Sequence, residues 1–123
     1  MYEVAIDASF AAAHHLRDYE GVCERLHGHN YRVRVVLAGE RLNKQGFLID
    51  FREARQMVGG AVERFDHAYL NELPPFDTLN PTAEQIARHI AECVAAAVPE
   101  GIVVRRVTCW ESDRCSATYR PRG

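Results

Sequence analysis

Two segments with alternating apolar residues constrain the fold more than any other feature of the sequence. Between Tyr2 and Phe10 every second residue is apolar, and three of the four residues between them are polar. The same alternation recurs between Asn30 and Ala38. Successive side chains of an extended strand point to opposite faces, so both segments predict half-buried strands. A sheet with one covered face must therefore be part of this fold.

Apolar residues at helical spacing predict the elements that cover this face. Asp50 is a candidate N-cap for a helix over about 51–64, and Thr82 for a second helix that ends near Pro99. Gln85, three residues after Thr82, completes a capping-box pattern. Further strands are expected over 102–110 and 115–120, and residues 14–28 are expected to form a loop.

The element order is therefore strand, strand, helix, helix, strand, strand. This order favours an α+β domain with a four-stranded antiparallel sheet and two helices on one face. A chain of 123 residues is expected to form a single domain over 1–123.

Composition limits the kinds of partner. The formal net charge of −2 provides no case for nucleic-acid binding. No segment resembles a signal peptide, and no apolar run is long enough to span a bilayer, so we expect a cytoplasmic protein without membrane contact. The four cysteines form no C-x-x-C pair, which argues against a cysteine-rich zinc module and favours reduced thiols.

The histidines indicate a metal site. His27 and His29 are two residues apart, so in an extended chain their side chains lie on the same face. His14 is a third candidate ligand from a separate segment. Three imidazoles leave one coordination position open, as in catalytic zinc sites, although other first-row metals also accept imidazole ligands. The alternative is that these are three unrelated surface histidines.

Cys23 lies four residues before His27, beside Glu24 and Arg25. A nearby cation and an arginine would lower the pKa of its thiol and favour the thiolate. A fourth metal ligand, a nucleophile and a general base are all compatible with this spacing. Cys93, by contrast, falls on the apolar stripe of the second helix, which favours core packing.

Asp66-His67 and Glu111 carry further groups that are able to act on a substrate. In Asp66-His67 the aspartate can orient an imidazole, although an exposed loop pair explains the same residues. Glu111 follows Trp110 at a strand end, where its carboxylate can accept two hydrogen bonds from an amidine-like edge or be an ordinary surface charge. His89, next to Arg88, is expected to face solvent.

Several short motifs together resemble those of the 6-pyruvoyltetrahydropterin synthase family, over nearly the whole chain. The motifs are Phe10-Ala11-Ala12-Ala13-His14, Cys23-Glu24-Arg25-Leu26-His27-Gly28-His29-Asn30-Tyr31, Leu48-Ile49-Asp50-Phe51, Asp66-His67-Ala68-Tyr69-Leu70-Asn71, Asn80-Pro81-Thr82-Ala83-Glu84 and Trp110-Glu111. The Cys-x-x-x-His-Gly-His spacing is similar to the branch of the family that forms 6-carboxy-5,6,7,8-tetrahydropterin for queuosine synthesis.

The resemblance implies a tunnelling fold, in which three subunits close a barrel and two trimers stack into a homohexamer with active sites between subunits. It implies zinc as the metal and 7,8-dihydroneopterin triphosphate as the substrate, with 6-carboxytetrahydropterin, acetaldehyde and triphosphate as products. A pyruvoyl-forming synthase on the same scaffold and a non-catalytic pterin-binding module are the alternatives.

The resemblance also implies roles for individual residues. Zinc would be held by His14, His27 and His29. Cys23 would be the catalytic base, and Asp66 and His67 would complete a proton relay. Glu111 would anchor the pterin ring, and Thr82 would line the pterin pocket.

Overall fold

A long antiparallel pair of strands forms the centre of the computed structural model, which describes residues 1–18 and 25–122. Strands β1 (Tyr2–His14) and β2 (His27–Gly39) pair along their whole length, from Tyr2 opposite Gly39 to His14 opposite His27. The predicted alternation is confirmed, because the even residues of β1 and the odd residues of β2 point to the covered face. Both strands extend into residues that we expected to be loop, since each provides backbone hydrogen-bond partners for the other beyond the alternating segments.

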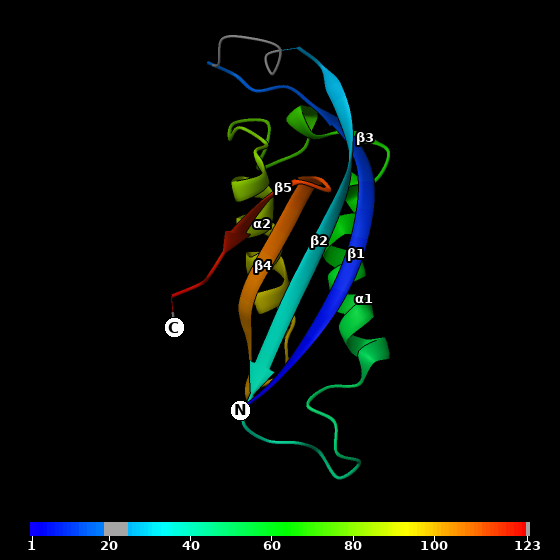
Figure 1. Ribbon diagram of the computed structural model, residues 1–123, viewed down its shortest axis with the longest axis vertical. Coiled ribbons are helices and arrows are strands. Elements are labelled where there is room, and N and C mark those ends of the chain that lie inside the picture. Colours follow the sequence, from blue (N-terminus) through cyan, green and yellow to red (C-terminus); the bar gives the residue numbers. More distant parts are fainter. Residues whose placement is uncertain (19–24, 123) are drawn as a thin grey trace.

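The complete sheet has five strands in the order β3-β1-β2-β4-β5 (Figure 1). Strands β4 (Ile102–Ser112) and β5 (Cys115–Tyr119) continue it antiparallel from β2. Strand β3 (Ala68–Tyr69) runs parallel to β1 at its other edge. The predicted four-stranded antiparallel sheet is therefore wrong in one respect: the sheet is mixed, and a two-residue strand is too short to leave an alternation pattern.

Helices α1 (Phe51–Val62) and α2 (Ala83–Ala95) cover one face of the sheet (Figure 1). Both predicted N-caps are confirmed, since the Asp50 carboxylate accepts from the Arg52 N–H and the Thr82 hydroxyl from the Gln85 N–H. Short 3-10 turns, η2 (Glu63–Phe65) and η3 (Leu70–Glu72), connect α1 to the rest of the chain.

The core lies between the helices and the sheet. It includes fully buried Tyr31, Phe65, Phe76 and Ile90, and Cys93 packs against it as predicted. The prediction for His89 is wrong. Its ring is half-buried, 5.6 and 5.7 Å from the ring centroids of Phe65 and Phe76, because the chain that follows α1 folds back over α2.

The other face of the sheet is polar. Arg34 forms a bidentate ion pair with Asp7, and the Arg32 guanidinium stacks 3.8 Å from the ring of Trp110. Among the described residues no strand pairs with the outer edge of β1 before Ala12. An open edge and an uncovered polar face leave room for a second copy of the chain.

No helix within residues 1–18 and 25–122 is long and apolar enough to cross a membrane. The cytoplasmic location remains a prediction.

Candidate metal centre and substrate site

The three candidate ligands converge at one end of the sheet. His14 ends β1, directly opposite His27 at the start of β2, and His29 lies two residues further along the same face. Nε2 of His14 lies 2.9 Å from Nε2 of His27. The predicted convergence of imidazoles from two segments is therefore present.

Glu111 from β4 completes this cluster, with its Oε1 2.9 Å from His29 Nε2 and 3.7 Å from His14 Nε2. One donor atom from each of the four residues lies within 4.8 Å of the others. The contact of Glu111 with the histidines was not predicted. A signal was available in the sequence, since Val107 and Cys109 are apolar and Glu111 follows at the same two-residue spacing, which puts all three side chains on one face of a strand.

Backbone carbonyls set the tautomers of two imidazoles. Nδ1 of His14 lies 2.8 Å from the Pro81 carbonyl, and Nδ1 of His27 lies 2.7 Å from the Arg25 carbonyl. A carbonyl only accepts hydrogen bonds, so we assign the proton to Nδ1 in both rings. Each Nε2 atom then carries a lone pair, and the two lone pairs point toward each other. A cation bound by both nitrogens stabilises this arrangement.

Burial also favours the neutral rings. It lowers the pKa of His14 and of His29, and the neighbouring imidazoles act in the same direction. Nε2 of His29 is buried without a hydrogen-bond partner of acceptable geometry. Neutral imidazoles with free lone pairs are the form that binds zinc and related ions. The donor set of three nitrogens and one carboxylate oxygen therefore fits a transition-metal ion.

The Tyr31 hydroxyl lies 3.0 Å from Nδ1 of His14, beneath the cluster. Burial raises the pKa of Tyr31, so the phenol stays protonated. This ring is one more buried contact that holds His14 in place.

Two asparagines fix the chain that leaves β1. The Asn71 side-chain amide bonds to both the N–H and the carbonyl of His15. The Asn80 amide does the same with Arg17. Neither role was predicted from the sequence. Each amide replaces the backbone partner that a neighbouring strand would provide, and so holds the end of β1 that carries His14.

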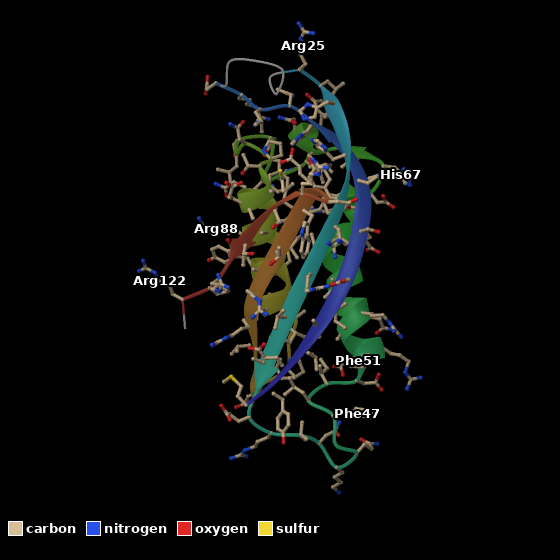
Figure 2. All side chains as sticks on the ribbon, viewed as in Figure 1. Arg25, Phe47, Phe51, His67, Arg88 and Arg122 are labelled. Atoms are coloured by element: carbon tan, nitrogen blue, oxygen red, sulfur yellow. The ribbon has the colours of Figure 1, made fainter. Side chains whose placement is uncertain are left out.

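Asp66 and His67 lie on the outer edge of β1. The Asp66 carboxylate accepts from the Ala11 N–H at 3.0 Å, and the His67 N–H donates to the Ala11 carbonyl at 2.6 Å. Their side chains approach within 3.6 Å. The His67 side chain is 84% exposed and projects outward beside β1 (Figure 2).

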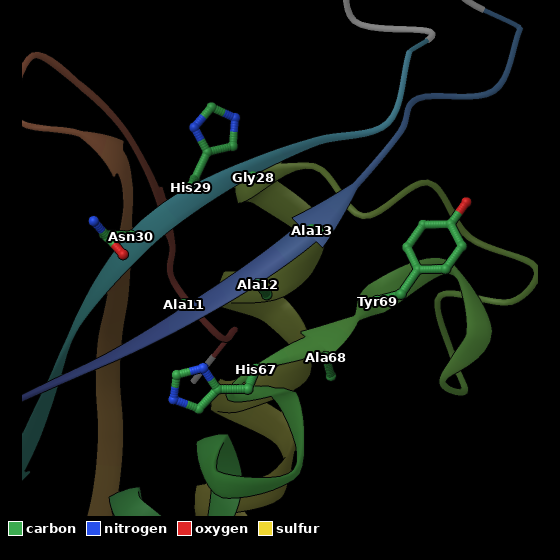
Figure 3. A pocket seen from close by; sticks show the side chains of 9 residues that line it. All are labelled: Ala11, Ala12, Ala13, Gly28, His29, Asn30, His67, Ala68 and Tyr69. Atoms are coloured by element: carbon green, nitrogen blue, oxygen red, sulfur yellow. The ribbon is translucent and has the colours of Figure 1, made fainter.

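An open pocket of about 590 Å³ lies over this edge of the sheet, and His29 and His67 are the two histidines that line it in the described part of the chain. It is lined by residues 11–13 of β1, residues 28–30 of β2 and residues 67–69. Figure 3 shows His29 and His67 on either side of the β1 ribbon. Within one subunit the predicted relay residues are thus not part of the histidine cluster.

The structure does not bring the last two predicted residues, Cys23 and Thr82, into the site. Cys23 lies outside the described residues. Thr82 does not line the cavity within the described part of the chain, and its hydroxyl caps α2. It does follow Pro81, whose carbonyl holds His14.

Comparison with known proteins now assigns the family. The family model described as 6-pyruvoyl tetrahydropterin synthase matches residues 3–122. The chain belongs to this family. The prediction that it is an enzyme, a pterin-processing lyase of the tetrahydropterin synthase type, is confirmed at this level.

Two curated relatives carry the names of different activities. The chain is 37% identical over 106 residues to a dihydroneopterin monophosphate aldolase of Pyrococcus furiosus, covering 86% of each chain. It is 35% identical over 131 residues to a 6-carboxy-5,6,7,8-tetrahydropterin synthase of Bacillus subtilis, covering 98% of this chain and 86% of the relative.

The solved structures agree on the fold. The 6-pyruvoyl tetrahydropterin synthase of Caenorhabditis elegans superimposes with a TM-score of 0.86 at 26% identity, covering 99% of this chain and 98% of that one.

Proposed function

We propose that this protein is a zinc-dependent lyase that converts 7,8-dihydroneopterin triphosphate to 6-carboxy-5,6,7,8-tetrahydropterin, acetaldehyde and triphosphate. The observation that carries the proposal is the pair of Nε2 lone pairs of His14 and His27, 2.9 Å apart, with His29 beside them. The relative from Bacillus subtilis and the family model support the reaction class. The product would enter the synthesis of queuosine precursors.

His14, His27 and His29 would hold the zinc ion. When bound, zinc supplies Lewis-acid polarisation of the oxygens on the pterin side chain. The carbonyls of Pro81 and Arg25 keep the Nδ1 protons of two of these rings, so that their Nε2 atoms remain available.

Proton movement would be the task of other residues. Cys23 would remove a proton from the substrate side chain as the general base. Asp66 would orient His67, whose exposed imidazole is free to exchange protons with substrate or solvent. Glu111 would accept hydrogen bonds from the amino and ring nitrogens of the pterin, and Thr82 would contribute to the pocket.

The open edges of the sheet support an assembly. The outer edge of β1 and that of β5 carry unpaired backbone groups in the described subunit, and the face between them is polar. Pairing between copies would close a barrel of three subunits and leave the polar face inside, and two such trimers would form a homohexamer. Asp66 and His67 of one subunit would then contribute to a site that holds the histidines of another.

A second candidate function is cleavage of a pterin monophosphate by an aldolase reaction. The relative from Pyrococcus furiosus carries that name. In the described part of the chain the cavity lining contains no lysine or arginine, and Arg17 donates to the carbonyls of Leu79 and Phe76 instead. A binding site with fewer cationic side chains would suit a monophosphate, which carries fewer negative charges than a triphosphate.

Product analysis distinguishes these functions. The zinc-loaded protein is incubated with 7,8-dihydroneopterin triphosphate and, separately, with the monophosphate, and the products are identified by mass spectrometry. Acetaldehyde and triphosphate support the proposal. Triphosphate without acetaldehyde would indicate a pyruvoyl-forming synthase, and a two-carbon aldehyde that keeps its phosphate would indicate an aldolase. If neither compound is turned over, the protein would be a non-catalytic pterin-binding module.

Two variants test the residue roles. Cys23→Ala is expected to abolish turnover, while Cys93→Ala, a matched removal of a thiol that packs on the core, retains it. Glu111→Ala is expected to weaken pterin binding by about 1.5–3 kcal/mol, the effect of losing a charged hydrogen-bond partner. Full turnover by Cys23→Ala would refute the assignment of the base.

A further inference from the structure

We propose that Arg64 and His89 form a pH-sensitive latch on residues 70–81, the segment that holds the metal ligand His14. The inference rests on the proposed metal site and names a regulation of it. Neither Arg64 nor His89 is among the residues assigned to the reaction. Both lie on the helical layer, away from the cluster of histidines at the end of the sheet.

Residues 70–81 hold the end of β1 through polar contacts. The side-chain amides of Asn71 and Asn80 bond to the backbone that follows His14. The Pro81 carbonyl accepts a hydrogen bond from Nδ1 of His14, 2.8 Å away. A displacement of this segment would therefore move a metal ligand.

Arg64 joins this segment to α2. Its Nη2 atom donates to the Pro74 carbonyl and also lies 3.3 Å from Nε2 of His89. The guanidinium carbon lies 4.5 Å from the ring centroid of Phe65, which keeps the arginine against η2. The bridge from the Pro74 carbonyl to the His89 ring thus passes through a single guanidinium nitrogen.

This bridge requires a neutral imidazole. A guanidinium only donates hydrogen bonds, so Nε2 of His89 is the acceptor, and the proton of the neutral ring is on Nδ1. The Cys93 sulfur lies 3.5 Å from the same Nε2, and burial raises the pKa of this thiol, which is therefore a second donor. Protonation of Nε2 would remove the acceptor that both groups share and would place a second positive charge beside Arg64.

The surroundings of His89 favour its neutral form. The rings of Phe65 and Phe76, with centroids 5.6 and 5.7 Å from that of His89, pack against it and carry no charge. Burial lowers the pKa of His89, the Arg64 guanidinium lowers it further, and Glu92 on α2 acts in the opposite direction. The latch is therefore closed at pH 7.5 and opens as the pH falls below the ordinary histidine value of about 6.5.

Hydrogen exchange of the metal-free protein at pH 7.5 and pH 5.5 tests the latch. The N–H groups of Phe76 and Leu79 donate to carbonyls of their own segment, so peptides that cover residues 70–81 report its opening. The measured quantity is the loss of protection between the two pH values, corrected for the intrinsic exchange rate. His89→Gln keeps a neutral acceptor and also controls for the titration of the metal-binding histidines.

We expect the loss of protection over residues 70–81 to be roughly fivefold larger in the parent than in His89→Gln. The limit is about tenfold at pH 5.5, since an imidazole with a pKa of about 6.5 in the opened state binds its proton no more strongly than that. Residues 31–37 of β2 should lose the same protection in both proteins.

Cobalt(II) affinity at pH 7.5, measured by competition with a chelator, tests the connection to the metal site. Arg64→Met keeps the aliphatic stem but lacks the donors, and should bind Co²⁺ several-fold more weakly than the parent. Arg88→Met is the matched control and should bind Co²⁺ like the parent. Arg88 is exposed on α2, and its guanidinium donates to Glu92 (Figure 2).

Equal loss of protection in the parent and in His89→Gln would overturn the proposal. It is equally overturned if Arg64→Met binds Co²⁺ as tightly as the parent. Absence of Co²⁺ binding by the parent would instead overturn the proposed metal site, and the exchange of the metal-free protein would still decide whether the latch exists.

Discussion

His67, a proposed catalytic residue, has a strained backbone conformation, and substitution by glycine measures this strain. Its φ angle is +56°, in the left-handed region, where a non-glycine residue costs about 1–2 kcal/mol. Its N–H donates to the Ala11 carbonyl, so the conformation is tied to the edge of β1. We expect the strain to be tolerated because the site requires an imidazole at this position.

His67→Gly removes the strain without removing the backbone hydrogen bond. The side chain is 84% exposed, so little burial is lost. Glycine destabilises through the larger entropy of the unfolded chain, by about 0.4–1 kcal/mol. The balance predicts that His67→Gly is more stable than the parent by about 0.5–1 kcal/mol, while its activity is lost.

The assay is urea denaturation at pH 7.5, followed by circular dichroism, with His67→Ala as the matched variant. Alanine also lacks the imidazole but keeps the left-handed penalty, so the difference between the two variants isolates the strain. We expect both to be inactive and the glycine variant to unfold at the higher urea concentration. If His67→Gly unfolds at the same concentration as His67→Ala or at a lower one, the argument from strain is wrong.

Three further predictions concern the metal, the helix cap and pH. Zinc at a hundredfold excess over its Kd should stabilise the protein by about 2.7 kcal/mol, measured by denaturation with and without a chelator, and His27→Ala should lose this gain. Thr82→Ala should lose about 1 kcal/mol of unfolding free energy and Thr82→Ser almost none, because only a hydroxyl accepts from the Gln85 N–H; equal losses would refute the cap. Burial and the nearby Arg64 guanidinium lower the pKa of His89 below the ordinary histidine value of 6.5. As the pH falls, the His89 imidazole of the unfolded chain therefore takes up its proton at a higher pH than that of the folded protein. The contribution of His89 to stability should be complete above about pH 6.5 and should fall as the pH drops below this value. Denaturation midpoints between pH 5 and 7 should show a shallower slope for His89→Gln, and an unchanged slope would contradict the burial of this ring.

Local patterns predicted most of the framework. The strands and helices were predicted because alternation, helical spacing and caps depend on residues within a few positions of each other. Asp50 and Thr82 act as caps as expected. The shared face of His27 and His29 was also accessible, because spacing along a strand determines which side chains point the same way. The position of His14 opposite His27 depends on the register between β1 and β2.

Features that depend on distant segments were not predicted. Strand β3 forms only because Ala68 and Tyr69 lie against the edge of β1, 56 residues earlier in the chain. The burial of His89 depends on Phe76 from a loop that precedes its helix. The position of Glu111 beside His29 depends on the register between β2 and β4.

The sequence by itself determined the two helices and the central parts of the four long strands, the residues that point to the covered face, and which imidazoles are candidates to share an ion. Only the tertiary structure decided that Pro81, 67 residues from His14, sets the tautomer of that ring, and that Asp66 and His67 lie on the outer edge of β1. The physical reason is the range of the interactions. Side-chain periodicity is a property of neighbouring residues, whereas strand register and hydrogen bonds between remote segments exist only once the whole core has packed.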